Sequence, residues 1–122
     1  MHEASPYRRV LFVRHCLLRV RLHRQCRREI AELPERIRGE LADGLARLDT
    51  GLPLSMPLSR PMPSIGRGAH ELRLRDRSGD YRIVYIVTQS GEIVVVLAFK
   101  KMTSKTPGRM IRLARSRARE SG

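Results

Sequence analysis

Three basic residues, Arg73, Arg82 and Lys101, are spaced so that consecutive β-hairpins would gather their side chains on one face of a sheet. If residues 76–79 form a four-residue hairpin loop, Arg73 lies opposite Arg82. If residues 90–91 form a two-residue loop, Lys101 falls on the same face as Arg82, because side chains alternate along a strand. Like charges opposite each other destabilise a sheet by about 0.2–1 kcal/mol per pair, so this arrangement favours a bound anion.

A phosphodiester is the anion that suits such a cluster. The planar guanidinium of arginine matches two phosphate oxygens, whereas lysine offers a point charge whose pKa falls when other cations crowd it. In RNA, the 2′-hydroxyl could attack the adjacent phosphorus while fixed cations stabilise the negative charge of the transition state. A general base and a general acid are also needed, and the candidates are Lys101, Lys105, His70 and Glu71. The sequence does not assign these two roles.

These residues also have ordinary structural interpretations. Arg73 and Arg82 could form surface ion pairs with nearby acidic side chains, and the lysines of residues 100–105 could be a solvated run. His70 could be a plain exposed histidine, and Phe99, which the expected register places opposite Arg82, could belong to the core. Candidate catalytic residues are Arg73, Arg82, Lys101 and Lys105; candidate RNA-binding residues are Arg60, Arg67, His70, Arg75, Phe99, Lys100, Arg109 and Arg112.

Metal chemistry has little support in the sequence. There is no carboxylate cluster and no histidine pair at ligand spacing, so neither a metal nor another cofactor is expected. Aromatic residues make up 4% of the chain and tryptophan is absent, which argues against a stacking surface for single-stranded nucleic acid.

The basic cluster requires an antiparallel meander, and the second half of the chain predicts one. Residues 70–75 alternate between polar and apolar side chains, residues 81–88 are rich in aromatic and β-branched side chains, and residues 93–99 are nearly all apolar. The last of these strands should be buried on both faces. Thr106 then resembles an N-cap with Pro107 at the first helical position, which predicts a short C-terminal helix.

The first half of the chain predicts helices. Apolar residues recur every three or four positions between residues 26 and 48, and Pro34 divides this stripe into a hairpin of two helices that ends by Gly51. Residues 51–68 are rich in proline and glycine and are expected to form a loop, and part of residues 7–22 is expected to form a first strand. The prediction is one α+β domain over residues 1–122, with an Arg-rich extension at 1–22.

The charge balance points to an anionic partner. The chain has 25 Lys and Arg residues against 12 Asp and Glu, a net charge of +13, although a codon-biased genome that favours arginine would give the same excess. Cys16 and Cys26 form no metal or disulfide pattern, which favours a reducing compartment. The apolar run at residues 10–13 is too short for a secretion signal or a membrane span, so a cytoplasmic protein is expected.

Four motifs resemble, in order and spacing, the phage-derived, HigB-like branch of the RelE/ParE toxin superfamily. They are His-Glu-Leu-Arg at 70–73, Gly-Asp-Tyr-Arg-Ile-Val-Tyr at 79–85, Ala-Phe-Lys-Lys at 98–101 and Lys-Thr-Pro at 105–107. An Ala-x-x-Arg element follows at residues 114–117, and the resemblance covers about residues 26–119.

The resemblance implies a RelE-like fold and a type II toxin that cleaves mRNA in the A site of the 70S ribosome without a metal. It also implies a toxin–antitoxin hetero-oligomer with an antitoxin from the adjacent gene, often of the helix-turn-helix type. By this resemblance Arg73, Arg82 and Lys101 are catalytic, and Lys105 contacts RNA or the ribosome. The chain departs from some relatives because its C-terminal helix has no tyrosine or histidine; Met110 and Arg112 occupy that region.

Two other functions compete with a nuclease. A non-catalytic inhibitor that binds RNA or the ribosome could use the same scaffold. A DNA-binding regulator is disfavoured, because no three-helix segment resembles a helix-turn-helix and the basic cluster lies at the end of a sheet. A neighbouring reading frame for an acidic or helix-turn-helix protein would favour the toxin.

Overall fold

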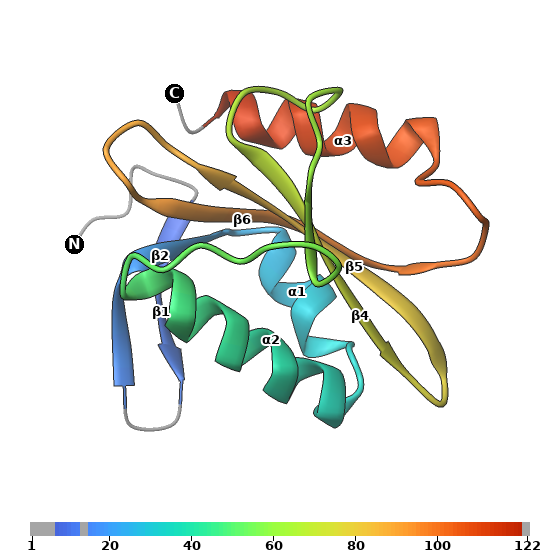
Figure 1. Ribbon diagram of the computed structural model, residues 1–122, viewed down its shortest axis with the longest axis horizontal. Coiled ribbons are helices and arrows are strands. Elements are labelled where there is room, and N and C mark those ends of the chain that lie inside the picture. Colours follow the sequence, from blue (N-terminus) through green and yellow to red (C-terminus); the bar gives the residue numbers. More distant parts are fainter. Residues whose placement is uncertain (1–6, 13–14, 121–122) are drawn as a thin grey trace.

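The computed structural model describes residues 7–12 and 15–120 and has the predicted α+β architecture (Figure 1). A six-stranded sheet has the order β1-β2-β6-β5-β4-β3. Helices α1 and α2 cover one face of this sheet, and α3 lies against the other (Figure 1). The strands are β1 (Tyr7–Phe12), β2 (His15–His23), β3 (Ser59–Pro61), β4 (Ala69–Asp76), β5 (Gly79–Val87) and β6 (Ile93–Lys101), and the helices are α1 (Cys26–Ala31), α2 (Glu35–Asp49) and α3 (Gly108–Arg119).

The predicted helical hairpin is confirmed. Pro34 is the N-cap of α2 and has an extended backbone with ψ of 150°, which separates the two helices. Four apolar residues of α2 spaced by three or four positions are buried against the sheet: Ile37, Leu41, Leu45 and Leu48. The helix ends at Asp49, and Gly51 has a φ of +92°, a conformation that favours glycine.

The predicted meander of β4, β5 and β6 is confirmed with two corrections to its turns. Arg73 pairs with Arg82 and Arg75 with Asp80, as the expected register predicted, but the predicted four-residue loop at residues 76–79 is wrong: Asp76 pairs with Gly79 and the turn is residues 77–78. The two-residue loop at residues 90–91 is wrong, because the Thr88 N–H donates to the Glu92 carbonyl and three residues lie between them.

A β-bulge compensates for the longer turn. The register between β5 and β6 shifts by one residue between Val84 and Tyr85, so that Arg82 still faces Phe99 as predicted. Val96 and Leu97 consequently both pack into the core under α3, whereas Val95 and Ala98 pack into the core under α1 and α2. Residues 93–98 are all buried, which confirms that the last strand is covered on both faces.

Three local predictions differ from the structure. The first strand predicted within residues 7–22 is an antiparallel hairpin of β1 and β2, and β2 runs parallel to β6; residues 1–6 and 13–14 lie outside the described part. The loop at 51–68 contains the short edge strand β3. Thr106 is not the N-cap of α3: Pro107 is, and the Thr106 hydroxyl donates to Glu71 instead. No described helix is long and apolar enough to cross a membrane.

Cys26 is expected to be unreactive in the folded protein. It is fully buried at the start of α1, and this burial, reinforced by the charge of Glu29, raises the pKa of its thiol. Because the pKa is raised in the folded state, this contribution to stability is present below the ordinary thiol pKa and is lost as the pH rises above it. In a Cys16→Ser background, thiol labelling of the native chain should be at least about 10³-fold slower than in denaturant. Equal rates would show that Cys26 is accessible.

Candidate functional site

A pocket of about 480 Å³ lies where β3, β4, β5 and β6 meet the loop that leads into α3. It contains the two arginines that face each other across the hairpin, and Lys101 from the end of β6. The structure therefore brings together the three residues whose convergence the expected register predicted. The charged residues that line the pocket are Arg60, Glu71, Arg73, Arg82, Lys101 and Lys105.

Arg82 is the most deeply buried cation of the pocket. Its residue is 7% exposed, its Nη1 donates to the Tyr81 carbonyl at 3.1 Å, and its Nε lies 3.6 Å from Glu71 Oε1. This Nε is buried and makes no hydrogen bond within residues 15–120. Burial lowers the pKa of Arg82; Glu71 opposes that shift and Arg73 adds to it. The guanidinium is thus fixed in place by its burial, by the Tyr81 carbonyl and by the neighbouring Glu71 carboxylate.

Glu71 is a buried carboxylate at the base of the same pocket. It is 2% exposed, and its Oε2 accepts a hydrogen bond from the Thr106 hydroxyl at 2.6 Å. The side chain therefore connects the sheet to the loop that precedes α3. One carboxylate faces five basic side chains in this pocket, so an anion can bind there without displacing Glu71.

The two lysines of the pocket are held by their own loop. Lys101 Nζ donates to the Ser104 carbonyl at 2.7 Å, and the Thr103 hydroxyl donates to the Lys105 carbonyl at 2.6 Å. These bonds curl residues 101–105 back over the end of β6. Lys101 is half-buried and Lys105 is exposed at the opening of the pocket.

The ion-pair interpretation, which concerned Arg73 and Arg82, holds for Arg82, which lies beside Glu71. A third arginine of the hairpin, Arg75, pairs through Nε with Asp80 Oδ1 at 2.7 Å. The hydrogen bond from Arg75 lowers the pKa of Asp80. Arg73 makes no ion pair with any residue in the described part of the chain, so its guanidinium remains available in the pocket.

Several predicted RNA-binding residues lie outside this pocket. Arg75 lines a neighbouring hollow that shares Arg73 and Arg82 with it. Phe99 and Lys100 line a different pocket between α1 and α3, and Phe99 also packs against the core. Arg67, Arg109 and Arg112 are exposed and do not line the cationic pocket.

His70 is not part of the cluster. Side chains alternate between the two faces of the sheet along β4, so the His70 ring lies on the face that α2 covers. There it stacks on Tyr85, with ring centroids 5.2 Å apart. Its Nδ1 is 3.0 Å from the Gly68 carbonyl. The structure thus leaves Glu71, Lys101 and Lys105 as the acid–base candidates in the pocket.

Sequence reasoning missed the roles of Thr106 and Ser104. Thr106 was assigned to a helix cap, whereas it binds Glu71, and Ser104 supplies the carbonyl that holds Lys101. No local pattern signals the Thr106 contact, because its partner lies 35 residues away in the chain. In the described part of the chain, no group of three or more His, Cys, Asp and Glu side chains could hold a metal ion.

Residues 28–119 match the family model described as Phage derived protein Gp49-like (DUF891). The chain belongs to this family. The Gp49-like family is associated with RelE/HigB-like toxins. The matched region includes every residue that lines the cationic pocket, so the pocket lies within the part of this chain that matches the family and not in the Arg-rich N-terminal extension. No curated protein matches the chain.

Proposed function

We propose that this Gp49-like protein is the toxin of a type II toxin–antitoxin module and cleaves mRNA in the ribosomal A site, as RelE/HigB-like toxins do. The observation that carries the proposal is the pocket in which Arg73, Arg82 and Lys101 converge beside a single buried carboxylate. Membership of a family associated with such toxins supports the same assignment.

In the proposed reaction, the scissile phosphate lies between the guanidinium groups of Arg73 and Arg82. The 2′-oxygen forms a bond to phosphorus, and the bond from phosphorus to the 5′-oxygen breaks. A base takes the proton of the 2′-hydroxyl and an acid protonates the leaving 5′-oxygen, so the products are a 2′,3′-cyclic phosphate and a 5′-hydroxyl. The two arginines stabilise the additional charge of the transition state.

The acid and base come from Glu71, Lys101 and Lys105 in this proposal. Glu71 can accept a proton but is already engaged by Thr106 and Arg82, so its main contribution is to position Arg82. Lys101 and Lys105 lie closer to the opening, where a leaving oxygen would emerge. The cognate antitoxin, encoded beside the toxin, would neutralise this basic surface.

A translated and an untranslated copy of one reporter transcript test this function. The wild-type chain should cut only the translated copy, and an Arg73→Ala/Lys101→Ala variant should lose at least about 10²-fold of that cleavage. These two residues are chosen because both are less buried than Arg82, so their replacement leaves the core intact. The measurement is the mapping of new 5′ ends after induction.

A second candidate is an inhibitor that binds the ribosome without cutting. It is favoured by the start of α3, where Ile111 is the residue that lines the pocket and no histidine or tyrosine is present. Growth arrest without new 5′ ends would select this alternative. Cleavage of both transcripts would exclude dependence on translation, and neither arrest nor cleavage by a soluble, intact chain would overturn the toxin assignment.

A further inference from the structure

The loop before β3 exposes apolar side chains in an otherwise highly charged protein. Residues 52–58 read Leu-Pro-Leu-Ser-Met-Pro-Leu and contain no charged residue, whereas 30% of the chain is charged. Leu52 is 54% exposed, Met56 56% and Leu58 40%. We call residues 52–58 the apolar loop. Several exposed apolar side chains on one short segment are typical of a surface where another molecule binds.

The apolar loop is held in this exposed conformation by the rest of the fold. The Ser59 N–H donates to the Ser55 carbonyl at 3.0 Å, and the Arg73 N–H donates to the Leu58 carbonyl at 2.8 Å. Leu54 packs against the core under α2. The exposed side chains therefore belong to an ordered loop. A partner that binds them loses little free energy to ordering the loop.

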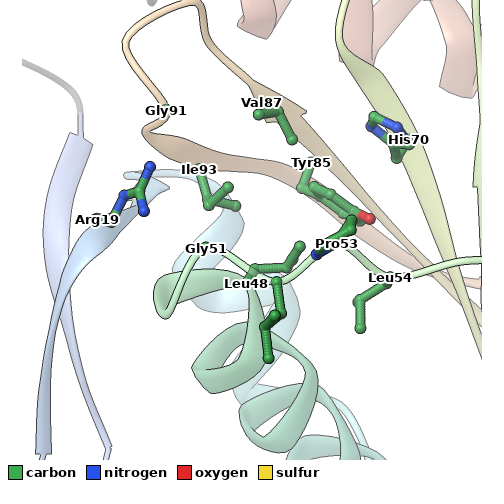
Figure 2. A pocket seen from close by; sticks show the side chains of 11 residues that line it. Arg19, Leu48, Gly51, Pro53, Leu54, His70, Tyr85, Val87, Gly91 and Ile93 are labelled. Atoms are coloured by element: carbon green, nitrogen blue, oxygen red, sulfur yellow. The ribbon is translucent and has the colours of Figure 1, made fainter.

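Each end of the apolar loop borders a pocket with basic residues. Figure 2 shows the first, about 260 Å³, where Pro53 and Leu54 face Tyr85 and Ile93, and Arg19 stands at one side. The Arg19 guanidinium makes no ion pair within residues 15–120, although its backbone N–H donates to the Asp49 carboxylate.

At the other end, Pro57 and Leu58 line the hollow that contains Arg73, Arg75 and Arg82. Asp80 also lines this hollow and is paired with Arg75. The surface is thus an apolar strip with one arginine at each end, Arg19 and Arg73, that forms no ion pair in the described part of the chain.

We propose that the apolar loop is the docking surface for an acidic partner protein. The segment that binds carries apolar side chains at its centre, one of which enters the pocket of Figure 2, and carboxylates at both ends that reach Arg19 and Arg73. Charge complementarity with a chain of net charge +13 selects an acidic protein over a second copy of this chain.

A bound partner would block the cationic pocket. The hollow beside Leu58 and the cationic pocket share Arg73 and Arg82, so a carboxylate on these guanidinium groups excludes a phosphate. The docking surface itself is inferred only from the exposed apolar side chains and the basic residues beside them. The further statement that the partner is the antitoxin rests on the proposed function.

Three labelled peptides serve as probes. One has leucines at its centre and glutamates at both ends, the second replaces the glutamates by lysines, and the third replaces the leucines by serines. The third peptide measures the non-specific attraction of any acidic chain to a basic protein. The test variant is Leu52→Ser/Met56→Ser/Leu58→Ser. The matched control is Leu113→Ser on α3, an apolar residue that is 37% exposed and lines neither of the two pockets beside the apolar loop.

The first peptide should bind the wild-type chain at least about tenfold more tightly than the other two, and the triple variant should lose that margin while the control keeps it. It should also compete with a non-cleavable 2′-O-methyl RNA for the wild-type chain. Equal binding of the first and third peptides, or an equal loss in the control variant, would overturn the proposal. So would a homodimer in sedimentation that the triple variant abolishes. None of these binding measurements requires RNA cleavage. The docking surface can therefore be confirmed or overturned even if the chain proves to have no nuclease activity.

Discussion

Replacing Arg82 by lysine is expected to slow cleavage of a translated message by about 10²–10³-fold, the effect of removing one fixed donor to a developing negative charge. Lysine keeps the positive charge beside Glu71 but loses the planar fork that can bind two phosphate oxygens. The guanidinium is positioned by burial and by its bond to the Tyr81 carbonyl, so under the proposed function the geometry that it would offer to a phosphate is set before the substrate binds.

Arg75→Lys is the matched control for this substitution. Arg75 lies on the same hairpin, but its side chain is exposed and pairs with Asp80 outside the cationic pocket. Cleavage by Arg75→Lys should stay within about threefold of the wild type, since surface ion pairs of this kind contribute about 0–1 kcal/mol. The measurement is the single-turnover rate of cleavage on programmed ribosomes, with thermal unfolding of each variant alongside.

Arg82→Ala is a poorer test of the chemistry. It would leave the Glu71 carboxylate buried without its cation, which costs about 3–5 kcal/mol and confuses lost folding with lost catalysis. If Arg82→Lys cleaved as fast as the wild type, a point charge would be sufficient and the fork geometry would have no part in the reaction. If Arg75→Lys fell as far as Arg82→Lys, the catalytic site would extend over the whole hairpin.

The helices and the strands β4, β5 and β6 could be predicted because their signals are local. Pro34 divides the helical stripe, and the turn at residues 77–78 places Arg73 opposite Arg82, in the register that the sequence predicted. The turn after β5 could not be predicted in the same way. A bulge and a three-residue turn produce the same pairing of Arg82 with Phe99 as a two-residue turn without a bulge. The predicted convergence of Arg73, Arg82 and Lys101 is therefore correct, although both predicted loop lengths are wrong.

The buried polar contacts could not be predicted because their partners are distant in the chain. The Ala-x-x-Arg element was noted only as a feature of resemblance, yet its arginine, Arg117, is buried and binds Glu29 88 residues away. Thr106 and Glu71 are likewise 35 residues apart. Sequence patterns report which residues are on a face, whereas such pairs depend on how two separate elements pack.

The last prediction concerns that arginine. Arg117→Met should lower the free energy of unfolding by about 3–5 kcal/mol, because it removes one partner of a largely buried ion pair. Arg117 Nη1 and Nη2 donate to the two Glu29 carboxylate oxygens at 3.0 and 2.9 Å, and Nη1 also donates to the Val96 carbonyl at 2.7 Å. Arg112→Met, on the exposed face of the same helix, should change stability by no more than about 0.5 kcal/mol.

Arg117→Met should also reduce cleavage, although Arg117 does not line the cationic pocket. Val96 lies at the bulge, and the Ala98 N–H donates to Glu29 Oε1, so the ion pair holds the backbone on both sides of the irregularity that sets the register of Arg82 with Phe99. Urea unfolding and cleavage rates of Arg117→Met, Glu29→Gln and the double variant separate the two effects. A double variant that loses less than the sum of the single losses indicates direct coupling. Full stability of Arg117→Met would mean that α3 stays attached without the ion pair, and that the bulge is set by the sheet alone.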